Sequence, residues 1–102
     1  MSEIMRLFGE WQDARHGATT AEPEDFPDTD AWEKYVEDCY CKRDNLELEM
    51  VKLTPATPAE VAAMVLATTQ WGDEPLIGYG FGDQLVAKLM ALAGCAEAPA
   101  AA

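Results

Sequence analysis

Apolar side chains recur at helical spacing along most of this chain, and few segments alternate as a strand would. Near the N-terminus, apolar positions lie three or four residues apart, directly after Ser2, which can cap a helix. They are Ile4, Leu7, Phe8 and Trp11. The pattern predicts a first helix of about 14 residues. Gly17 is expected to end it, because glycine commonly terminates helices.

The second predicted helix is the longest and covers residues 30–53. Asp30 is its expected N-cap, with Glu33 completing a capping box, and residues 17–29 before it are expected to form an extended connection. Its apolar stripe has the four- and three-residue spacing of a helix that packs against another helix, in this chain or in a second copy. The stripe consists of Trp32, Val36, Cys39, Leu46, Met50 and Leu53, with Arg43 at one of its positions.

A third helix follows a break that contains two prolines. Thr57, Pro58 and Glu60 occupy the N-cap, first and third positions of a strong helix start. This helix is expected to end by Trp71 and Gly72, since glycine favours termination. The break and the new start predict two helices rather than one continuous helix.

A fourth helix is predicted near the C-terminus, where Leu85, Leu89 and Leu92 share one face. Glycines at 78, 80 and 82 oppose its extension towards the N-terminus, by about 1 kcal/mol each. The apolar spacing nevertheless continues back through Ile77, so we expect the helix to begin near Pro75. The sequence thus predicts an all-α single domain over residues 1–95, a bundle of about four helices with a long central helix, and a flexible Ala-rich tail at 96–102.

Charge narrows the function classes. The 102 residues include 19 acidic and 7 basic side chains, a net charge of −12. The electrostatic field of a protein with this negative charge repels phosphate groups, so direct binding to nucleic acid or to an anionic membrane is not expected. No apolar run approaches the length of a membrane span, and the N-terminus lacks the pattern of a signal peptide. We therefore expect a cytoplasmic protein with reduced cysteines.

The negative charge is concentrated between residues 21 and 38. This segment contains eight acidic side chains and one basic side chain, Lys34. One interpretation is a row of carboxylates that imitates phosphates to a basic groove. The other is a solvated face that keeps a small protein soluble. The eight residues are Glu22, Glu24, Asp25, Asp28, Asp30, Glu33, Glu37 and Asp38.

Metal sites have weaker support. Asp25, Asp28 and Asp30 lack the glycine and the glutamate of an EF-hand loop at the required offsets. Cys39 and Cys41 lie two residues apart, so on a helix they point to different faces and not at one metal ion. We expect no metal and no cofactor.

Catalysis and nucleotide binding also have weak support. The glycine-rich segment 78–82 has neither the lysine nor the preceding strand of a phosphate-binding loop. His16, the single histidine, has no serine or cysteine fixed near it by sequence. The chain is therefore predicted not to be an enzyme.

Two motifs resemble those of a known group of proteins. The segment WQDAR at 11–15 and the turn TPAT at 54–57 are similar to a helix and a turn in small helical proteins of proteobacterial genomes and prophages. The resemblance covers roughly residues 7–66. It implies a helical architecture and an origin in a mobile element, and because that group has no assigned activity it transfers no functional residue.

These observations predict a non-enzymatic interaction protein of phage or mobile-element origin. Its acidic face would occupy a basic surface on a host nucleic-acid-binding protein, as anti-CRISPR proteins and other DNA-mimicking inhibitors do; the similarity to them is one of size, charge and origin. The alternative is a homodimeric helical assembly protein of a prophage, in which the apolar stripe of residues 32–53 pairs two copies and the acid only solubilises. Arg43 favours the alternative, since a polar residue in such a stripe often sets pairing.

Overall fold

In the computed structural model, every regular element of the described residues, 2–77 and 81–94, is a helix. The elements are α1 (Glu3–Thr20), the short 3₁₀ helix η1 (Pro23–Asp25), α2 (Thr29–Val51), α3 (Pro58–Thr68) and α4 (Gly82–Leu92). The predicted all-α class with a long second helix is confirmed. The tail at 96–102 and two of the glycines ahead of α4, at 78 and 80, lie outside the described residues.

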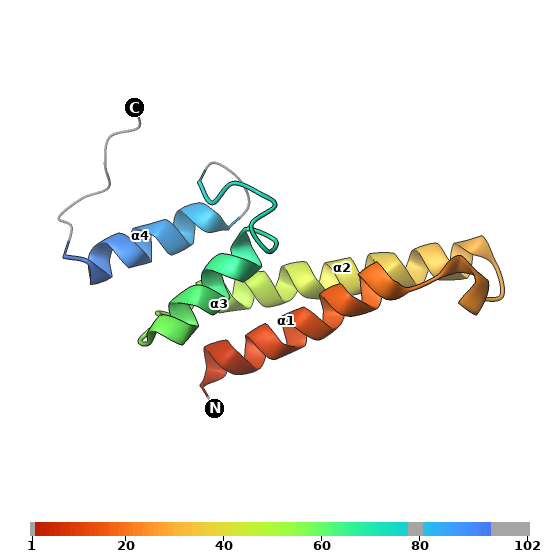
Figure 1. Ribbon diagram of the computed structural model, residues 1–102, viewed down its shortest axis with the longest axis horizontal. Helices are drawn as coiled ribbons and strands as arrows, with labels where there is room; N and C mark the ends of the chain where they lie inside the picture. Colours follow the sequence, from red (N-terminus) through yellow and green to blue (C-terminus); the bar gives the residue numbers. More distant parts are fainter. Residues whose placement is uncertain (1, 78–80, 95–102) are drawn as a thin grey trace.

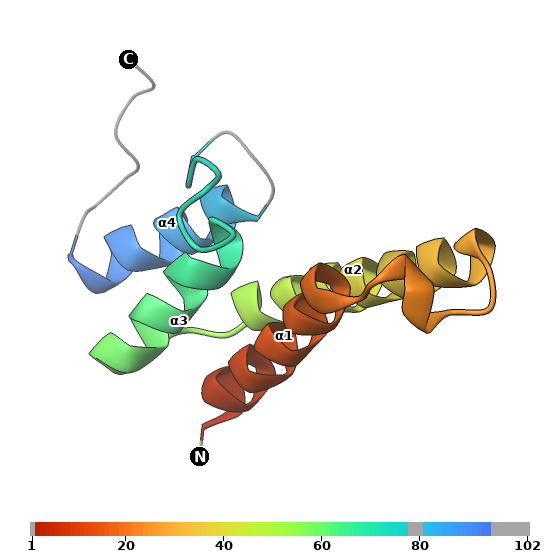
Figure 2. The ribbon, with the colours of Figure 1, turned by 45° about the vertical axis from the view of Figure 1, so that its right-hand side comes forward.

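α1 and α2 form an antiparallel hairpin, and α3 and α4 lie beside one end of it (Figure 1). The other end extends away from α3 and α4 in both views (Figures 1 and 2). We call this end, residues 17–40, the arm. The molecule measures 55 × 35 × 18 Å. Its radius of gyration, 15.9 Å, exceeds the roughly 13 Å of a compact domain of this length.

The hydrophobic core lies at the end opposite the arm. Each of the four α-helices contributes at least one large, fully buried side chain to it, among them Trp11 from α1, Met50 from α2, Met64 from α3 and Leu85 from α4. Removing such side chains from water is the main force that holds the helices together. In the arm, α1 and α2 pack only against each other, because α3 and α4 do not extend that far, so the outer faces of the arm remain exposed.

The first helix does not end at Gly17, as the sequence analysis expected, but continues to Thr20. Gly17 lies where α2 passes close to α1. A Cβ at this position would be 3.1 Å from the Tyr35 Oη and 3.3 Å from the Cys39 Sγ. The glycine therefore allows the two helices to approach, and the helix ends at Thr20, just before Ala21, whose backbone is extended.

The predicted N-cap of α2 was also wrong. Asp28, not Asp30, has the extended backbone of an N-cap, and its carboxylate accepts a 2.8 Å hydrogen bond from the Ala31 amide. Asp30 lies inside the first helical turn. Because α1 is longer, η1 is present and α2 starts at Thr29, residues 17–29 are not the extended connection that was predicted.

The start of α3 is confirmed. The Thr57 hydroxyl accepts a 3.1 Å hydrogen bond from the Glu60 amide, and the Glu60 carboxylate accepts one of 2.9 Å from the Ala56 amide. The hydrogen bond from the Ala56 amide lowers the pKa of the Glu60 carboxyl group because it favours the ionised form. After α3, Gln70 and Trp71 adopt left-handed backbone angles, with φ of 52° and 60°, and reverse the chain.

α4 begins at Gly82 and not near Pro75. Residues 75–77 are not helical, and Gly82 packs directly against the backbone of Leu76: a Cβ there would overlap the Leu76 carbonyl oxygen. The apolar spacing before Gly82 therefore did not mark a helix. α4 is attached to the end of α2 by Lys88, whose ammonium donates to the carbonyl of Val51 and, at 2.8 Å, to that of Leu53.

Candidate interaction surface on the helical hairpin

The eight acidic residues singled out in the sequence all lie on the arm, and all are exposed. Glu22, Glu24 and Asp25 come from the connection between α1 and α2, Asp28 and Asp30 from the start of α2, and Glu33, Glu37 and Asp38 from its first three turns. The structure therefore brings them together at the free end of the hairpin, far from α3 and α4 (Figure 1).

Little positive charge balances these carboxylates. Lys34 Nζ lies 3.1 Å from Asp38 Oδ2, and Asp28 is engaged in capping α2. Within residues 2–77 and 81–94, the other six form no ion pair. Their negative charge remains available to a partner. In the same ranges, no three His, Cys, Asp or Glu side chains converge as metal ligands would.

An apolar groove runs along α2 from the arm towards the core end. Trp32, Val36 and Tyr40, four residues apart, supply its apolar walls, and its volume is about 320 Å³. The flanking residues are Glu33, Glu37, Cys41 and Asp44. We call this feature the α2 groove. It places an apolar row beside an acidic row on one helix.

Both aromatic walls of the α2 groove are held in place. The indole Nε1 of Trp32 donates a 3.1 Å hydrogen bond to the carbonyl of Ala21, which ties the first turn of α2 to the end of α1. The guanidinium of Arg43 lies 4.6 Å from the centre of the Tyr40 ring, within the range of a cation–π contact. Arg43 is itself held by Asp44 at 3.0 Å. The groove is thus preformed.

A second, more polar hollow adjoins the groove and shares Asp44 with it. Its volume is also about 320 Å³, and Glu47, Gln70 and Glu74 contribute to its lining. Glu47 is buried, and this burial raises the pKa of its carboxyl group, against the effect of the hydrogen bonds from Trp11 and Gln70. The Gln70 Oε1 is buried and has no hydrogen-bond partner among the described residues. The hydrogen bonds that Glu47 accepts from Trp11 and Gln70 connect α1, α2 and the turn after α3 and fix their relative positions.

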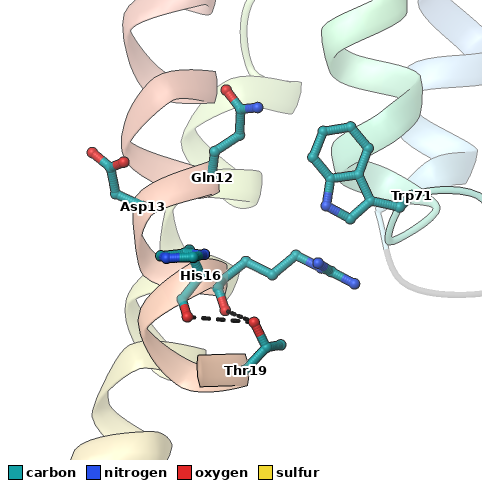
Figure 3. Close-up of a pocket in the computed structure, with 6 residues that line it drawn as sticks. Gln12, Asp13, His16, Thr19 and Trp71 are labelled. Carbon is teal, nitrogen blue, oxygen red and sulfur yellow. Dashed lines mark hydrogen bonds between the residues drawn. The ribbon is translucent and has the colours of Figure 1, made fainter. Parts of the chain in front are cut away.

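A third hollow lies between α1 and Trp71, a residue of the turn after α3 (Figure 3). It has a volume of about 400 Å³ and is lined by Gln12, Asp13, Arg15, His16, Thr19 and Trp71. The Thr19 hydroxyl donates to the backbone carbonyls of Arg15 and His16, at 3.0 and 3.3 Å, rather than to the His16 ring. The arrangement therefore offers a polar surface but no hydroxyl nucleophile activated by a base.

The stripe proposed from the sequence as a dimer seam is divided by the fold. Met50 is fully buried in the core, and Leu46 and Leu53 pack against it. Cys39 lies beside Gly17 of α1. The remaining two members, Trp32 and Val36, line the α2 groove. Most of the stripe is thus used within the chain, and only its N-terminal end is free to meet another molecule.

Sequence reasoning missed Tyr40, Asp44 and Glu47. Tyr40 follows Val36 by four residues, so a search for spacing of four alone would have found it. Asp44 lies on the same side of α2 as Glu33 and Glu37. Nothing local marks Glu47, because its main partner, Trp11, precedes it by 36 residues.

Comparison of the chain with family models, with curated proteins and with solved structures finds no match. The resemblance of residues 7–66 to prophage-encoded proteins therefore stays a prediction. None of the helices in the described residues is long and apolar enough to cross a membrane.

Proposed function

We propose that this protein is a non-enzymatic interaction protein that presents its acidic arm to the basic, nucleic-acid-binding surface of a host protein. The observation that carries the proposal is the position of the carboxylates. All eight are exposed at the free end of a hairpin, where only Lys34 offers a local counter-charge. An arm that projects from the core can enter a groove that a compact acidic surface would not reach.

The physical basis is electrostatic attraction at a distance. Carboxylates on neighbouring turns of a helix lie about 5–6 Å apart, so the arm carries closely spaced negative charges along a narrow rod. A surface rich in Lys and Arg that evolved to hold phosphates attracts such a rod and is then blocked to nucleic acid. This binding should be fast and should weaken as salt is added.

In this proposal the protein belongs to a phage or another mobile element and acts in the bacterial cytoplasm. Like the anti-CRISPR proteins and other DNA mimics, it would inhibit its target by occupying the site without any chemical step. The target is recognised by its chemistry, a basic cleft that binds nucleic acid.

The test compares two variants with the same change of net charge. The arm variant carries Glu22→Lys and Glu24→Lys, both in the connection and outside the α2 groove. The body variant carries Glu49→Lys and Asp73→Lys, which are exposed but lie off the arm. Each protein is immobilised and exposed to a bacterial lysate treated with nuclease, and the captured proteins are then eluted with duplex DNA.

We expect wild type and the body variant to capture a protein that duplex DNA releases and that itself binds DNA. The arm variant should capture at least tenfold less, since its end repels a basic cleft. Equal losses in both variants would show that only net charge matters, and captured proteins that DNA does not release would contradict mimicry.

A further inference from the structure

The α2 groove gives a more specific account of the partner. We propose that it binds a basic amphipathic helix of the partner protein, whose apolar side chains lie against Trp32, Val36 and Tyr40 and whose Lys or Arg side chains meet Glu33 and Glu37. The inference rests on the proposed function and names the part of the partner that the hairpin engages.

The two rows of the groove match the surface pattern of a helix. Residues four apart on α2 succeed one another at about 6 Å along its axis and form a ridge, so Trp32–Tyr40 and the adjacent acidic row are two neighbouring ridges. A partner helix packs by placing a ridge of its own into the furrow between them. Such helix-in-groove binding uses anchors spaced by three or four residues.

Charge selects a basic partner and disfavours a second copy of this chain. Glu33 and Glu37 are exposed, form no ion pair among the described residues, and repel each other at four-residue spacing. Cations from a partner would relieve this repulsion. A second copy would bring its own Glu33 and Glu37 to the same place, because a symmetric interface pairs a surface with itself.

The aromatic side chains that line the α2 groove, Trp32 and Tyr40, are suited to anchor a partner helix. Tryptophan and tyrosine are the side chains that most often dominate binding energy at interfaces. Trp32 and Tyr40 are held by Ala21 and Arg43, as described above, so little conformational freedom remains to be lost when a partner packs on them. The adjoining face of α2, at Tyr35 and Cys39, contacts α1 at Gly17, whereas the row of Trp32, Val36 and Tyr40 lines an open groove.

The experiment uses the full chain and two synthetic peptides of about five helical turns. In the first peptide, leucines form one row of a helix and lysines form the adjacent row. The second has the same composition in scrambled order, without rows. Binding is measured by calorimetry with wild type, with Val36→Asn and with Leu48→Asn. Leu48 is an exposed apolar residue of α2 outside the groove, and circular dichroism confirms that both variants are folded.

We expect wild type to bind the amphipathic peptide at least tenfold more tightly than the scrambled one. Val36→Asn should weaken binding of the amphipathic peptide about tenfold and leave the scrambled peptide unaffected, because the substitution removes apolar contact and no charge. Leu48→Asn should bind both peptides as wild type does.

The two proposals fail in different ways. If both peptides bind equally and Val36→Asn changes neither, the groove proposal is overturned, while capture by the arm can still succeed. If light scattering shows a dimer that Val36→Asn dissociates, and neither peptide binds, the groove is a contact between copies and the proposal is overturned as well. If the amphipathic peptide binds as expected but no captured protein is released by DNA, the groove stands and the proposed function fails.

Discussion

The indole Nε1 of Trp11 donates a 2.8 Å hydrogen bond to the Glu47 Oε1 inside the core. The same oxygen accepts a hydrogen bond from the side-chain Nε2 of Gln70 and lies 4.0 Å from the Arg43 Nε. One carboxylate, 5% exposed, thus links α1, α2 and the turn after α3. This turn also carries Trp71, whose ring packs edge-on against that of Trp11.

The stability of the protein should depend on pH through Glu47. Burial raises the pKa of this carboxyl group above its ordinary value of 4.5, since desolvation disfavours the charge. The folded chain therefore binds this proton at a higher pH than the unfolded chain does. The contribution of Glu47 to stability is greatest below pH 4.5 and falls as pH rises through the folded pKa.

Glu47→Gln isolates this effect, because its amide oxygen still accepts from Trp11 and it does not titrate. Urea unfolding at a series of pH values should show that the variant gains stability relative to wild type as pH rises above 4.5. A difference that is constant with pH would contradict the raised pKa. Glu47→Ala leaves the buried Trp11 donor without a partner and should cost about 1–3 kcal/mol.

The N-cap of α2 can be tested by a pair of alanine substitutions. Asp28→Ala removes the acceptor for the Ala31 amide and should lower the free energy of unfolding by about 1 kcal/mol. Asp30→Ala keeps the cap and removes only a charge near the helix N-terminus, which should cost about 0.3–1 kcal/mol at low salt and less at high salt. Chemical denaturation of both variants at two salt concentrations distinguishes the roles, and a larger loss at Asp30 would be inconsistent with the structure.

Two glycines should respond to alanine in opposite directions. At Gly82 the new Cβ overlaps the Leu76 carbonyl oxygen, so the start of α4 must shift, and we expect a loss of stability. At Gly9, inside α1, nothing lies within 4 Å of the new Cβ, and the gain in helix propensity should stabilise the protein by about 1 kcal/mol. Thermal unfolding measures both, and stabilisation by Gly82→Ala would contradict the close packing described above.

Lys88 should hold α4 against the rest of the molecule. Lys88→Met keeps the length of the side chain and removes the donor to the carbonyls of Val51 and Leu53. We expect a loss of about 1.5–3 kcal/mol, as for hydrogen bonds to charged groups, with faster amide exchange in α4 than in α1 or α2. Lys42→Met, at an exposed position of α2, is the control. Equal exchange in all helices of the Lys88 variant would show that the contact does not anchor α4.

Local signals predicted the starts of α1 and α3 correctly, but placed the N-cap of α2 at Asp30 instead of Asp28. The Ser2 hydroxyl accepts from the Met5 amide and that of Thr57 from the Glu60 amide, as their positions in the sequence indicated. Apolar spacing failed near Pro75, where it continued through residues that are not helical, and the glycine signal failed at Gly17, because glycine has two uses. It ends helices, but it also lets one backbone approach another, and the approaching segment is not visible in the local sequence.

The sequence by itself determined the helical class, the long second helix and the concentration of acid between residues 21 and 38, because periodicity and charge are properties of neighbouring residues. Tertiary structure alone decided which part of the apolar stripe became core and which became groove. Met50 and Trp32 belong to the same stripe, yet Met50 lies in the core cluster with side chains of α1 and α3, while Trp32 lies on the arm, where it lines the α2 groove and is hydrogen-bonded to Ala21 at the end of α1. Burial depends on which distant segments pack nearby, so Glu47 became a buried link between helices and Glu33 an exposed charge beside an open groove.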